Sequence, residues 1–239
     1  MKPFIMILVA CVLFSCGNSK TNSAADATDT SATSDKAITA VMQTELTPDS
    51  VITLLKEGNQ RFYTFQPRRF NDRRRIKETA SGQWPMAAVL SCIDSRVPVE
   101  TVVNMGIGDL FVARVAGNVE NEDMLGSLEF ACDVMKAKVI LVLGHEECGA
   151  VKSAIDSVKL GNITALLARI QPAVGATHTP GDRDSHNKQF VHDVAIKNIE
   201  FTVNKMRKDS HIIDSLVQNN HIKILRGMYD VKNGKITFF

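Results

Sequence analysis

Short apolar runs alternate with helical patterns through the middle of this 239-residue chain. Three runs, residues 86–91, 110–115 and 139–143, are rich in β-branched and other apolar side chains, as is typical of buried strands. Residues 124–135, between the second run and the third, place apolar side chains at helical spacing. Because strands that alternate with helices build parallel sheets, this pattern predicts an α/β fold.

The flanking segments complete the predicted fold. A helix is expected from Val51 to Phe62, and residues 222–228 predict a further strand. Asn233-Gly234 then predicts a hairpin turn into a last strand, residues 235–239, which runs antiparallel. Between the strand at 139–143 and the strand at 222–228, the sequence predicts one exposed loop over 175–187 and several helices. The predicted helices cover residues 150–158, 164–170, 185–206 and 212–217. We expect one domain with a central, mostly parallel sheet of about five strands, an antiparallel edge strand and helices on both faces.

The amino terminus has the pattern of an export signal. Lys2 precedes an apolar run from Phe4 to Phe14, which is too short to span a bilayer. Leu13-Phe14-Ser15-Cys16 resembles a bacterial lipoprotein lipobox, so Cys16 is expected to carry lipid. Signal peptidase cleavage without lipid is the alternative. The resemblance implies an exported lipoprotein that faces the periplasm or the cell surface and is held to the membrane by its lipid.

Three segments follow from this signal. Residues 1–15 are the expected signal peptide, and residues 16–46 the expected lipidated cysteine and flexible tether. Most of the tether consists of Ser, Thr, Ala, Asp and Asn, with too little apolar surface to fold. The remaining residues, 47–239, form the expected folded domain.

The charges exclude one class of partner. The formal net charge of +2 is spread along the chain, so no nucleic-acid partner is expected. The densest basic run is expected to form a solvated or subunit-contacting face, and it consists of Arg68, Arg69, Arg73, Arg74 and Arg75.

Two short motifs follow two of the predicted strands. Cys92-Ile93-Asp94-Ser95-Arg96 ends the first run, and His145-Glu146-Glu147-Cys148-Gly149 follows the third. The carboxyl ends of neighbouring parallel strands meet at one edge of a sheet, where α/β proteins bind ligands. Two thiolates and one imidazole, with a fourth position left for water, make the ligand set of a catalytic zinc site. We therefore expect one zinc ion per subunit, bound by Cys92, His145 and Cys148.

The cysteines allow a second interpretation. In an oxidising compartment Cys92 and Cys148 could instead form a disulfide. A structural disulfide would not require the adjoining His145 or the ion pair of Asp94 and Arg96. The presence of these residues therefore favours a metal site over a disulfide. Cys132 lies among apolar residues and is expected to be a buried apolar side chain.

Asp94 and Arg96 predict an enzyme rather than a metal-storage protein. Asp94 lies two residues beyond Cys92 and can accept a hydrogen bond from a zinc-bound hydroxide. A bidentate Arg96 keeps that carboxylate ionised and prevents it from replacing the water on zinc. A turn-stabilising ion pair is the alternative role for these two residues.

At this point the motifs resemble those of beta-class carbonic anhydrases. The resemblance runs from about residue 47 to the end and rests on Gly58-Asn59-Gln60-Arg61-Phe62, residues 92–98, 108–112, Ala116-Gly117-Asn118, residues 144–149 and Tyr229-Asp230. It implies zinc-dependent, reversible hydration of carbon dioxide to bicarbonate and a proton. It assigns the zinc to Cys92, His145 and Cys148, with Asp94 and Arg96 orienting the reaction.

The resemblance also implies a substrate pocket and an oligomer. Gln83 would bind bicarbonate, and Gly149 is a further substrate-binding position. Phe111, Ala116 and Phe130 match the apolar wall for carbon dioxide, although plain core is their alternative role. Family sites are built across a dimer interface, so a homodimer or tetramer is expected.

Some members of this family bind bicarbonate at a second pocket that shuts the enzyme off. Arg114 and Tyr229 match two residues of that pocket, whereas Val89 stands where those members carry tryptophan. The metal site is therefore expected to be open, with Asp94 off the metal. Two other functions remain as alternatives: a related zinc hydrolase acting on carbon disulfide or carbonyl sulfide, and a non-enzymatic zinc-binding lipoprotein.

Overall fold

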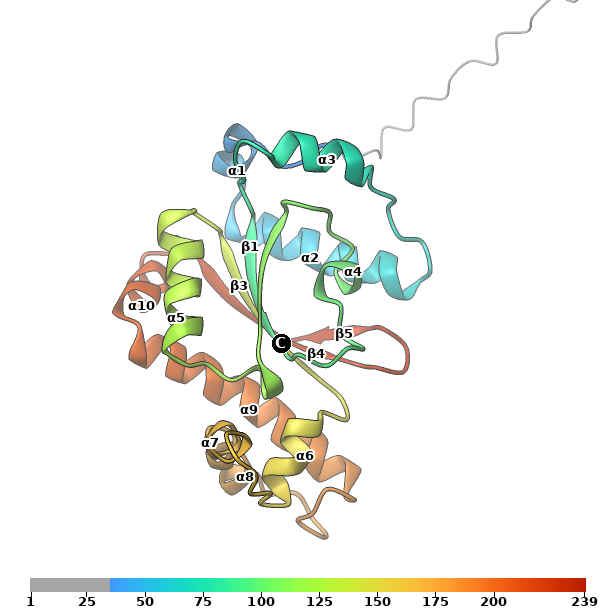
Figure 1. The fold of residues 1–239 in the computed structure, drawn as a ribbon, viewed down its shortest axis with the longest axis vertical. Coiled ribbons are helices and arrows are strands. Elements are labelled where there is room, and N and C mark those ends of the chain that lie inside the picture. The colour runs from blue at the N-terminus through green and yellow to red at the C-terminus, as the bar shows by residue number, and fades with distance from the viewer. Residues whose placement is uncertain (1–34) are drawn as a thin grey trace, which may run out of the picture. The chain divides into compact units, whose positions relative to one another are not determined.

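Five strands form a sheet in the computed structural model, which describes residues 35–239. The strands are β1 (Ala87–Ser91), β2 (Leu110–Arg114), β3 (Val139–His145), β4 (Lys223–Tyr229) and β5 (Ile236–Phe238). Their order is β2-β1-β3-β4-β5, with β5 antiparallel to β4 and every other pairing parallel (Figure 1). The predicted α/β sheet with an antiparallel edge strand is confirmed.

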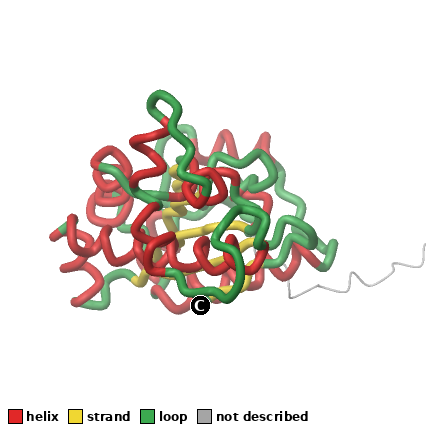
Figure 2. Tube along the Cα trace, turned by 90° about the horizontal axis from the view of Figure 1, so that it is seen from below, coloured by secondary structure: helices red, strands yellow, loops and turns green. Residues whose placement is uncertain are grey.

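Helices cover both faces of this sheet (Figure 2). The helical elements of the described chain are α1 (Ala40–Glu45), α2 (Pro48–Tyr63), α3 (Asp72–Thr79), α4 (Val99–Val102), the 3₁₀ turn η1 (Ala116–Asn118), α5 (Glu122–Glu129), the π-helical turn η2 (Phe130–Val134), α6 (Gly149–Ile155), α7 (Ile163–Ala168), α8 (Gln171–Ala176), α9 (Lys188–Asp209) and α10 (His211–Gln218).

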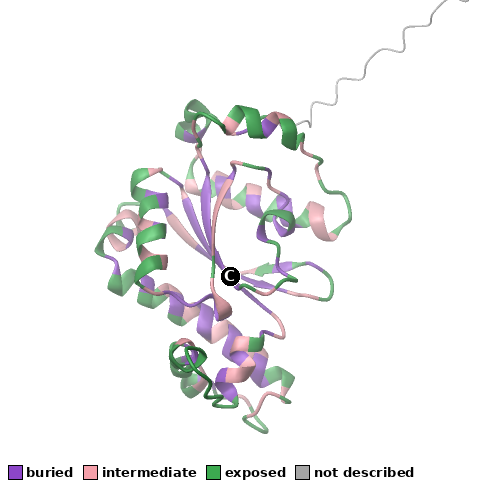
Figure 3. Ribbon diagram, viewed as in Figure 1, coloured by how far each residue is buried: buried purple, intermediate pink, exposed green. Residues whose placement is uncertain are grey.

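The alternation of side chains along the strands divides the core into two layers. Ala88 and Leu90 of β1 pack toward a cluster that includes Phe190 and Ile199 of α9. The intervening residues of β1 and β3 face the opposite layer, formed mainly by α2 and α4. Successive side chains of a strand point to opposite faces, so a strand covered on both sides must be apolar throughout. β1 and β3 are accordingly buried along their whole length (Figure 3).

The folded part of the chain begins earlier than expected. Asp35 to Leu46 pack onto the domain, and α1 lies within the predicted tether. The buried side chain of Gln43 donates hydrogen bonds to the carbonyls of Pro85 (2.7 Å) and Met135 (2.8 Å). The tether prediction is therefore wrong for residues 35–46, because the buried amide of Gln43 and the apolar side chains of Ile38 and Leu46 attach this segment to the domain.

The basic run also differs from its expected role. Arg75 is 2% exposed and pairs with the buried Asp109 at 2.9 Å. It also donates to the carbonyls of Asp35, Lys36 and Ile107. A buried arginine is tolerated when its donors are satisfied in this way. Arg75 therefore joins α3 to the amino ends of the strands, and the solvated face is formed by its neighbours.

The signal peptide, Cys11 and Cys16 lie outside the described residues. Within the described range, none of the helices combines the length and apolar character that crossing a bilayer requires.

Candidate metal centre

The three predicted ligands lie at the carboxyl ends of two neighbouring strands. Cys92 directly follows β1, His145 is the last residue of β3, and Cys148 is the N-cap of α6. β1 and β3 pair in parallel with Ser91 opposite Leu143, so both strands end at the same edge. Adjacent strand ends thus bring together residues that are 53 positions apart, from 92 to 145.

The geometry of these side chains fits a tetrahedral zinc ion. The sulfurs of Cys92 and Cys148 are 4.0 Å apart, and the three ligand atoms lie within 4.8 Å of one another. Two thiolates at about 2.3 Å from a tetrahedral zinc ion are about 3.8 Å apart, close to this separation. All three side chains are buried, and both cysteines are free thiols. Cys92 and Cys148 therefore do not form the alternative disulfide in this structure.

The hydrogen bond of His145 selects the nitrogen that can bind a metal. Nδ1 lies 2.9 Å from the carbonyl oxygen of Glu146, which can only accept, so Nδ1 carries the proton. Nε2 is then the unprotonated nitrogen, and it is buried without a hydrogen-bond partner. A buried nitrogen that faces two thiols and has no partner is what a metal ligand requires.

The pKa values of the two cysteine thiols are shifted in opposite directions. The hydrogen bond between them lowers the pKa of Cys92 to about 4, with further help from His145 and from the backbone amide of Gly117, which lies 3.4 Å from Sγ. The same hydrogen bond, together with burial, raises the pKa of Cys148. One proton is therefore held between the two sulfurs, and a divalent cation would replace it by favouring both thiolates.

Asp94 and Arg96 form the predicted ion pair beside the ligands. Arg96 donates from Nε to Oδ1 at 2.9 Å and from Nη2 to Oδ2 at 2.8 Å, and its backbone amide donates to Oδ1 as well. These hydrogen bonds hold the pKa of Asp94 well below its usual range. Oδ2 remains 3.8 Å from Nε2 of His145. The carboxylate is thus ionised, faces the ligand cluster and is held by Arg96.

Arg114 holds the backbone of the first motif. From β2 it donates to the carbonyl of Cys92 at 2.9 Å and to the carbonyl of Asp94 at 2.7 Å. Tyr229 ends β4 opposite His145, and burial raises its pKa. Val89 is fully buried in β1. Arg114 is thus engaged by the motif itself, and it fixes the loop that carries Cys92 and Asp94.

The predicted substrate residues divide into two groups. Ala116 begins η1, next to the glycine whose amide meets Cys92, and Gly149 begins α6 directly after Cys148, with open space around its Cα. Gln83 instead lies four positions before β1, at the amino end of the strand that Cys92 follows. β1 has five residues, so the Cα atoms of its first and last residues are about 13 Å apart at ~3.3 Å per residue. Within one subunit, Gln83 therefore lies at the other end of the sheet from the metal ligands.

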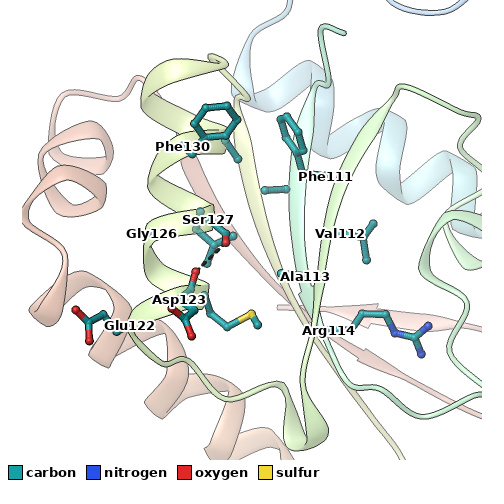
Figure 4. A pocket seen from close by; sticks show the side chains of 13 residues that line it. Phe111, Val112, Ala113, Arg114, Glu122, Asp123, Gly126, Ser127 and Phe130 are labelled. Carbon is teal, nitrogen blue, oxygen red and sulfur yellow. Dashed lines mark hydrogen bonds between the residues drawn. The ribbon is translucent and has the colours of Figure 1, made fainter. Parts of the chain in front are cut away.

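Phe111 and Phe130 belong to the distant group as well. They line an open cleft of about 770 Å³ between β2 and α5, in which their rings meet edge to face at 6.4 Å (Figure 4). None of the three metal ligands lines this cleft. Phe130 is 49% exposed, and β2 is an edge strand of the sheet. The structure thus places two residues of the predicted apolar wall, Phe111 and Phe130, on an open edge of the subunit, whereas Ala116 lies near the metal ligands.

Two supporting residues were not singled out from the sequence. Gly117 has φ of 74° and directs its amide at Cys92, and the side chain of Asn198 in α9 donates to the Gly117 carbonyl at 2.8 Å. Ala116-Gly117-Asn118 is recognisable in the sequence as a motif. Its glycine was the one feature from which a turn with a positive φ could have been predicted. Asn198 lies 81 positions from Gly117, and no local pattern marks it.

The chain matches known proteins over most of its folded part. A family model described as carbonic anhydrase matches residues 87–236. Carbonic anhydrase 2 of Mycobacterium tuberculosis is 32% identical over 189 residues, which are 76% of this chain and 87% of that protein. A carbonic anhydrase of Mycolicibacterium smegmatis is 39% identical over 128 residues, covering 50% of this chain and 61% of the relative.

Solved structures share the fold. The beta-carbonic anhydrase CcaA superposes with a TM-score of 0.63 at 23% identity, covering 80% of this chain and 88% of that chain. One of two tetrameric beta-carbonic anhydrases from Sordaria macrospora gives a TM-score of 0.60, also at 23% identity, over 69% and 85% of the two chains. At this identity the likeness concerns the fold alone.

Proposed function

The chain belongs to the carbonic anhydrase family and has the fold of its beta class, and we propose that its reversible hydration of carbon dioxide takes place at Cys92, His145 and Cys148. One observation carries this assignment: the unprotonated Nε2 of His145 is buried, has no hydrogen-bond partner and faces two thiols. Zn²⁺ fits this donor set, and when bound it supplies a water acidic enough to act as a nucleophile near neutral pH.

Asp94 and Arg96 orient the reacting groups. The ionised carboxylate of Asp94 faces the ligand cluster, where it can accept a hydrogen bond from the attacking water and so fix the direction of its lone pair. Arg96 binds both carboxylate oxygens, which keeps Asp94 charged and in place. Arg114, in β2, fixes the backbone of the same loop by donating hydrogen bonds to the carbonyls of Cys92 and Asp94. Two arginines thus set the position of the Asp94 carboxylate before the reaction begins.

We further propose that a second subunit completes the substrate pocket. Gln83, Phe111 and Phe130 cannot reach the metal ligands of their own subunit, because they lie toward the amino ends of β1 and β2 or on the open cleft. Docking of two copies along the β2 edge would bring these residues to the ligands of the partner. The exposed ring of Phe130 and the free edge strand support such an interface. A homodimer, or a tetramer built from it, follows.

A third proposal concerns location. Cys16 and the apolar run before it support an exported chain whose lipid anchors it to a membrane, facing the periplasm or the cell surface.

The activity is tested by stopped-flow hydration of carbon dioxide with the full chain and a matched pair of cysteine variants. Cys148→Ser is expected to lose zinc and activity together, because it removes a ligand. Cys132→Ser, at a buried cysteine outside the cluster, is expected to keep both. A protein that binds one zinc ion per subunit and still fails to hydrate carbon dioxide would refute the assignment.

The shared pocket is tested by mixing two inactive variants. Asp94→Asn disables the carboxylate of one site, and Gln83→Ala disables the substrate contact. If Gln83 acts in the partner's site, a mixed dimer contains one intact site and regains part of the activity. If each subunit uses its own Gln83, the mixture stays as inactive as the separate variants, which would contradict the proposal.

A further inference from the structure

Two acidic residues of the second motif have no part in the metal site described so far. Glu146 and Glu147 form the turn between the ligands His145 and Cys148. Glu147 adopts φ of 57°, in the left-handed region that residues with a Cβ rarely occupy. A backbone conformation of this kind persists only where the surrounding contacts hold it. The contacts of the two glutamates therefore decide how firmly the two ligands are held.

The backbone of Glu146 is hydrogen-bonded at both its amide and its carbonyl. The amide donates to the carbonyl of Tyr229 at 2.9 Å, directly after the last paired residue of β3. The carbonyl accepts a hydrogen bond from Nδ1 of His145 at 2.9 Å, which leaves Nε2 to face the thiols. The orientation of the His145 ring therefore depends on where Glu146 places its carbonyl oxygen.

The side chain of Glu146 is held by His192 of α9. Nδ1 of His192 lies 2.6 Å from Oε1 of Glu146, and it donates the hydrogen bond because a carboxylate oxygen only accepts. Within residues 35–239, no other group is hydrogen-bonded to this carboxylate. Lys188 and Lys232 line the same cleft of about 260 Å³, but neither forms an ion pair with Glu146. His192 is therefore the anchor of this side chain.

The position of His192 is itself fixed by the core. Its neighbour in sequence, Val191, is buried in the cluster that α9 forms with the sheet, and α9 lies against β3 (Figure 1). Further along the same helix, Asn198 holds the turn whose amide meets Cys92. α9 thus contacts the supports of both motifs, and its packing gives it a fixed position from which to hold them.

We propose that His192 is a positioning residue of the metal site, which holds Glu146 so that the Glu146 carbonyl holds the ring of His145. The proposal rests on the proposed zinc-dependent function. His192 forms no hydrogen bond with a metal ligand, so its effect passes through Glu146. Without His192, the Glu146 side chain is free to turn into the adjoining cleft, and the turn loses a fixed point next to the left-handed Glu147.

An ordinary surface ion pair is the alternative role for His192 and Glu146, and pairs of that kind contribute little. α9 offers such a pair for comparison. Lys197 and Glu200 are 2.6 Å apart, and their side chains are 37% and 32% exposed, close to the 37% and 25% of His192 and Glu146. Both members of the comparison pair belong to α9, so breaking it disturbs the same helix without touching the metal-binding turn.

The first test measures the zinc affinity of the full chain by competition with a chelator. Groups that orient a metal-binding histidine change metal affinity about 10- to 100-fold when removed. Because His192 lies one residue further from the metal, we expect His192→Ala to lower the affinity about 10-fold, at the lower end of that range. Lys197→Ala should leave it unchanged. His192→Asn should recover most of it, because the amide nitrogen can donate to the same carboxylate.

The unaltered chain separates this proposal from the function on which it rests. If the unaltered chain binds no zinc, the metal site is refuted and the positioning role falls with it. If the unaltered chain binds zinc and hydrates carbon dioxide, while His192→Ala binds zinc equally well, the positioning role alone is overturned.

A double-mutant cycle tests the route through Glu146. In Glu146→Ala the carbonyl remains but its side-chain anchor is gone, so the further change His192→Ala should cost no more affinity. A second loss of about 10-fold in the double variant would mean that His192 acts by another route, which contradicts the proposal.

Cobalt binding reports on the arrangement of the ligands themselves. Co²⁺ bound in place of zinc has visible absorption bands that depend on ligand geometry. We expect these bands to shift in His192→Ala, to return in His192→Asn and to stay unchanged in Lys197→Ala. Unshifted bands in His192→Ala would show that the ligands keep their arrangement without His192, and would overturn its positioning role.

Discussion

The backbone amide of Gly117 donates a hydrogen bond of 3.4 Å to the sulfur of Cys92. Gly117 adopts φ of 74°, a conformation that side chains with a Cβ rarely adopt. Its carbonyl is held at 2.8 Å by the buried side chain of Asn198. A ligand from β1 is therefore stabilised by a turn after β2, and that turn is held in place by α9.

Gly117→Ala should weaken the metal site. A Cβ at this position would lie 2.6 Å from Cδ1 of Ile170, and the positive φ adds strain of about 1–3 kcal/mol. We expect zinc affinity to fall about 10- to 100-fold, as when other groups that support a metal ligand are removed. Competition with a chromophoric chelator measures this. Gly175→Ala, at a helical glycine with open space around it, should leave affinity unchanged. Equal affinities for Gly117→Ala and the unaltered chain would exclude the amide as a support for Cys92.

Asn198→Ala should destabilise the same turn from α9. Removing the amide leaves the buried carbonyl of Gly117 without its donor, which costs about 1–3 kcal/mol of unfolding free energy. Thermal unfolding should shift downward by several degrees, and zinc affinity should fall as well. Asn204→Ala, on an exposed side of the same helix, is the control. A stability loss with unchanged zinc affinity would make Asn198 a core residue without influence on the site.

The sequence predicted the parts of the site that local patterns encode. Cys92 and His145 follow apolar runs, and the rule that parallel strands end at one edge brings them together. Gly117 and Asn198 escaped prediction because their contact crosses 81 positions and depends on how α9 packs. Arg75 was misassigned for the same reason. Its neighbours in sequence are exposed cations, while its partner Asp109 lies 34 positions away.

The amino-terminal boundary was misplaced for a different reason. Residues 35–46 were grouped with the polar tract that precedes them, although six of these twelve residues are apolar and Ile38 and Leu46 pack against the core. One buried side chain, Gln43, supplies hydrogen bonds to two carbonyls of the domain and secures the segment. A single well-placed amide leaves almost no trace in composition or periodicity.

Asp94→Asn should separate catalysis from metal binding. The amide has nearly the same shape but carries no charge, so it neither attracts Arg96 nor orients a reacting water as strongly. We expect kcat/KM for carbon dioxide hydration to fall roughly 100-fold with the zinc content unchanged. Glu100→Gln, an exposed carboxylate in α4, should have no effect. Full activity in zinc-loaded Asp94→Asn would show that the Asp94–Arg96 pair only stabilises the turn.

The rates at which Cys92 and Cys132 are alkylated should depend differently on pH, because their surroundings shift their pKa values in opposite directions. Thiolates react and thiols do not, so the pKa of each group sets the pH at which it is modified. The pKa of Cys92 is lowered to about 4, mainly by its hydrogen bond with Cys148, whereas burial raises the pKa of Cys132 to about 12. After removal of metal by a chelator, iodoacetamide should modify Cys92 at an almost constant rate from pH 6 to 9. Cys132 should stay unmodified over that range, because its thiol ionises only at much higher pH. Added zinc should protect Cys92, and peptide mass spectrometry identifies the modified residue. Modification of Cys132 at pH 7, or of Cys92 only above pH 8, would contradict the acidities that the buried contacts imply.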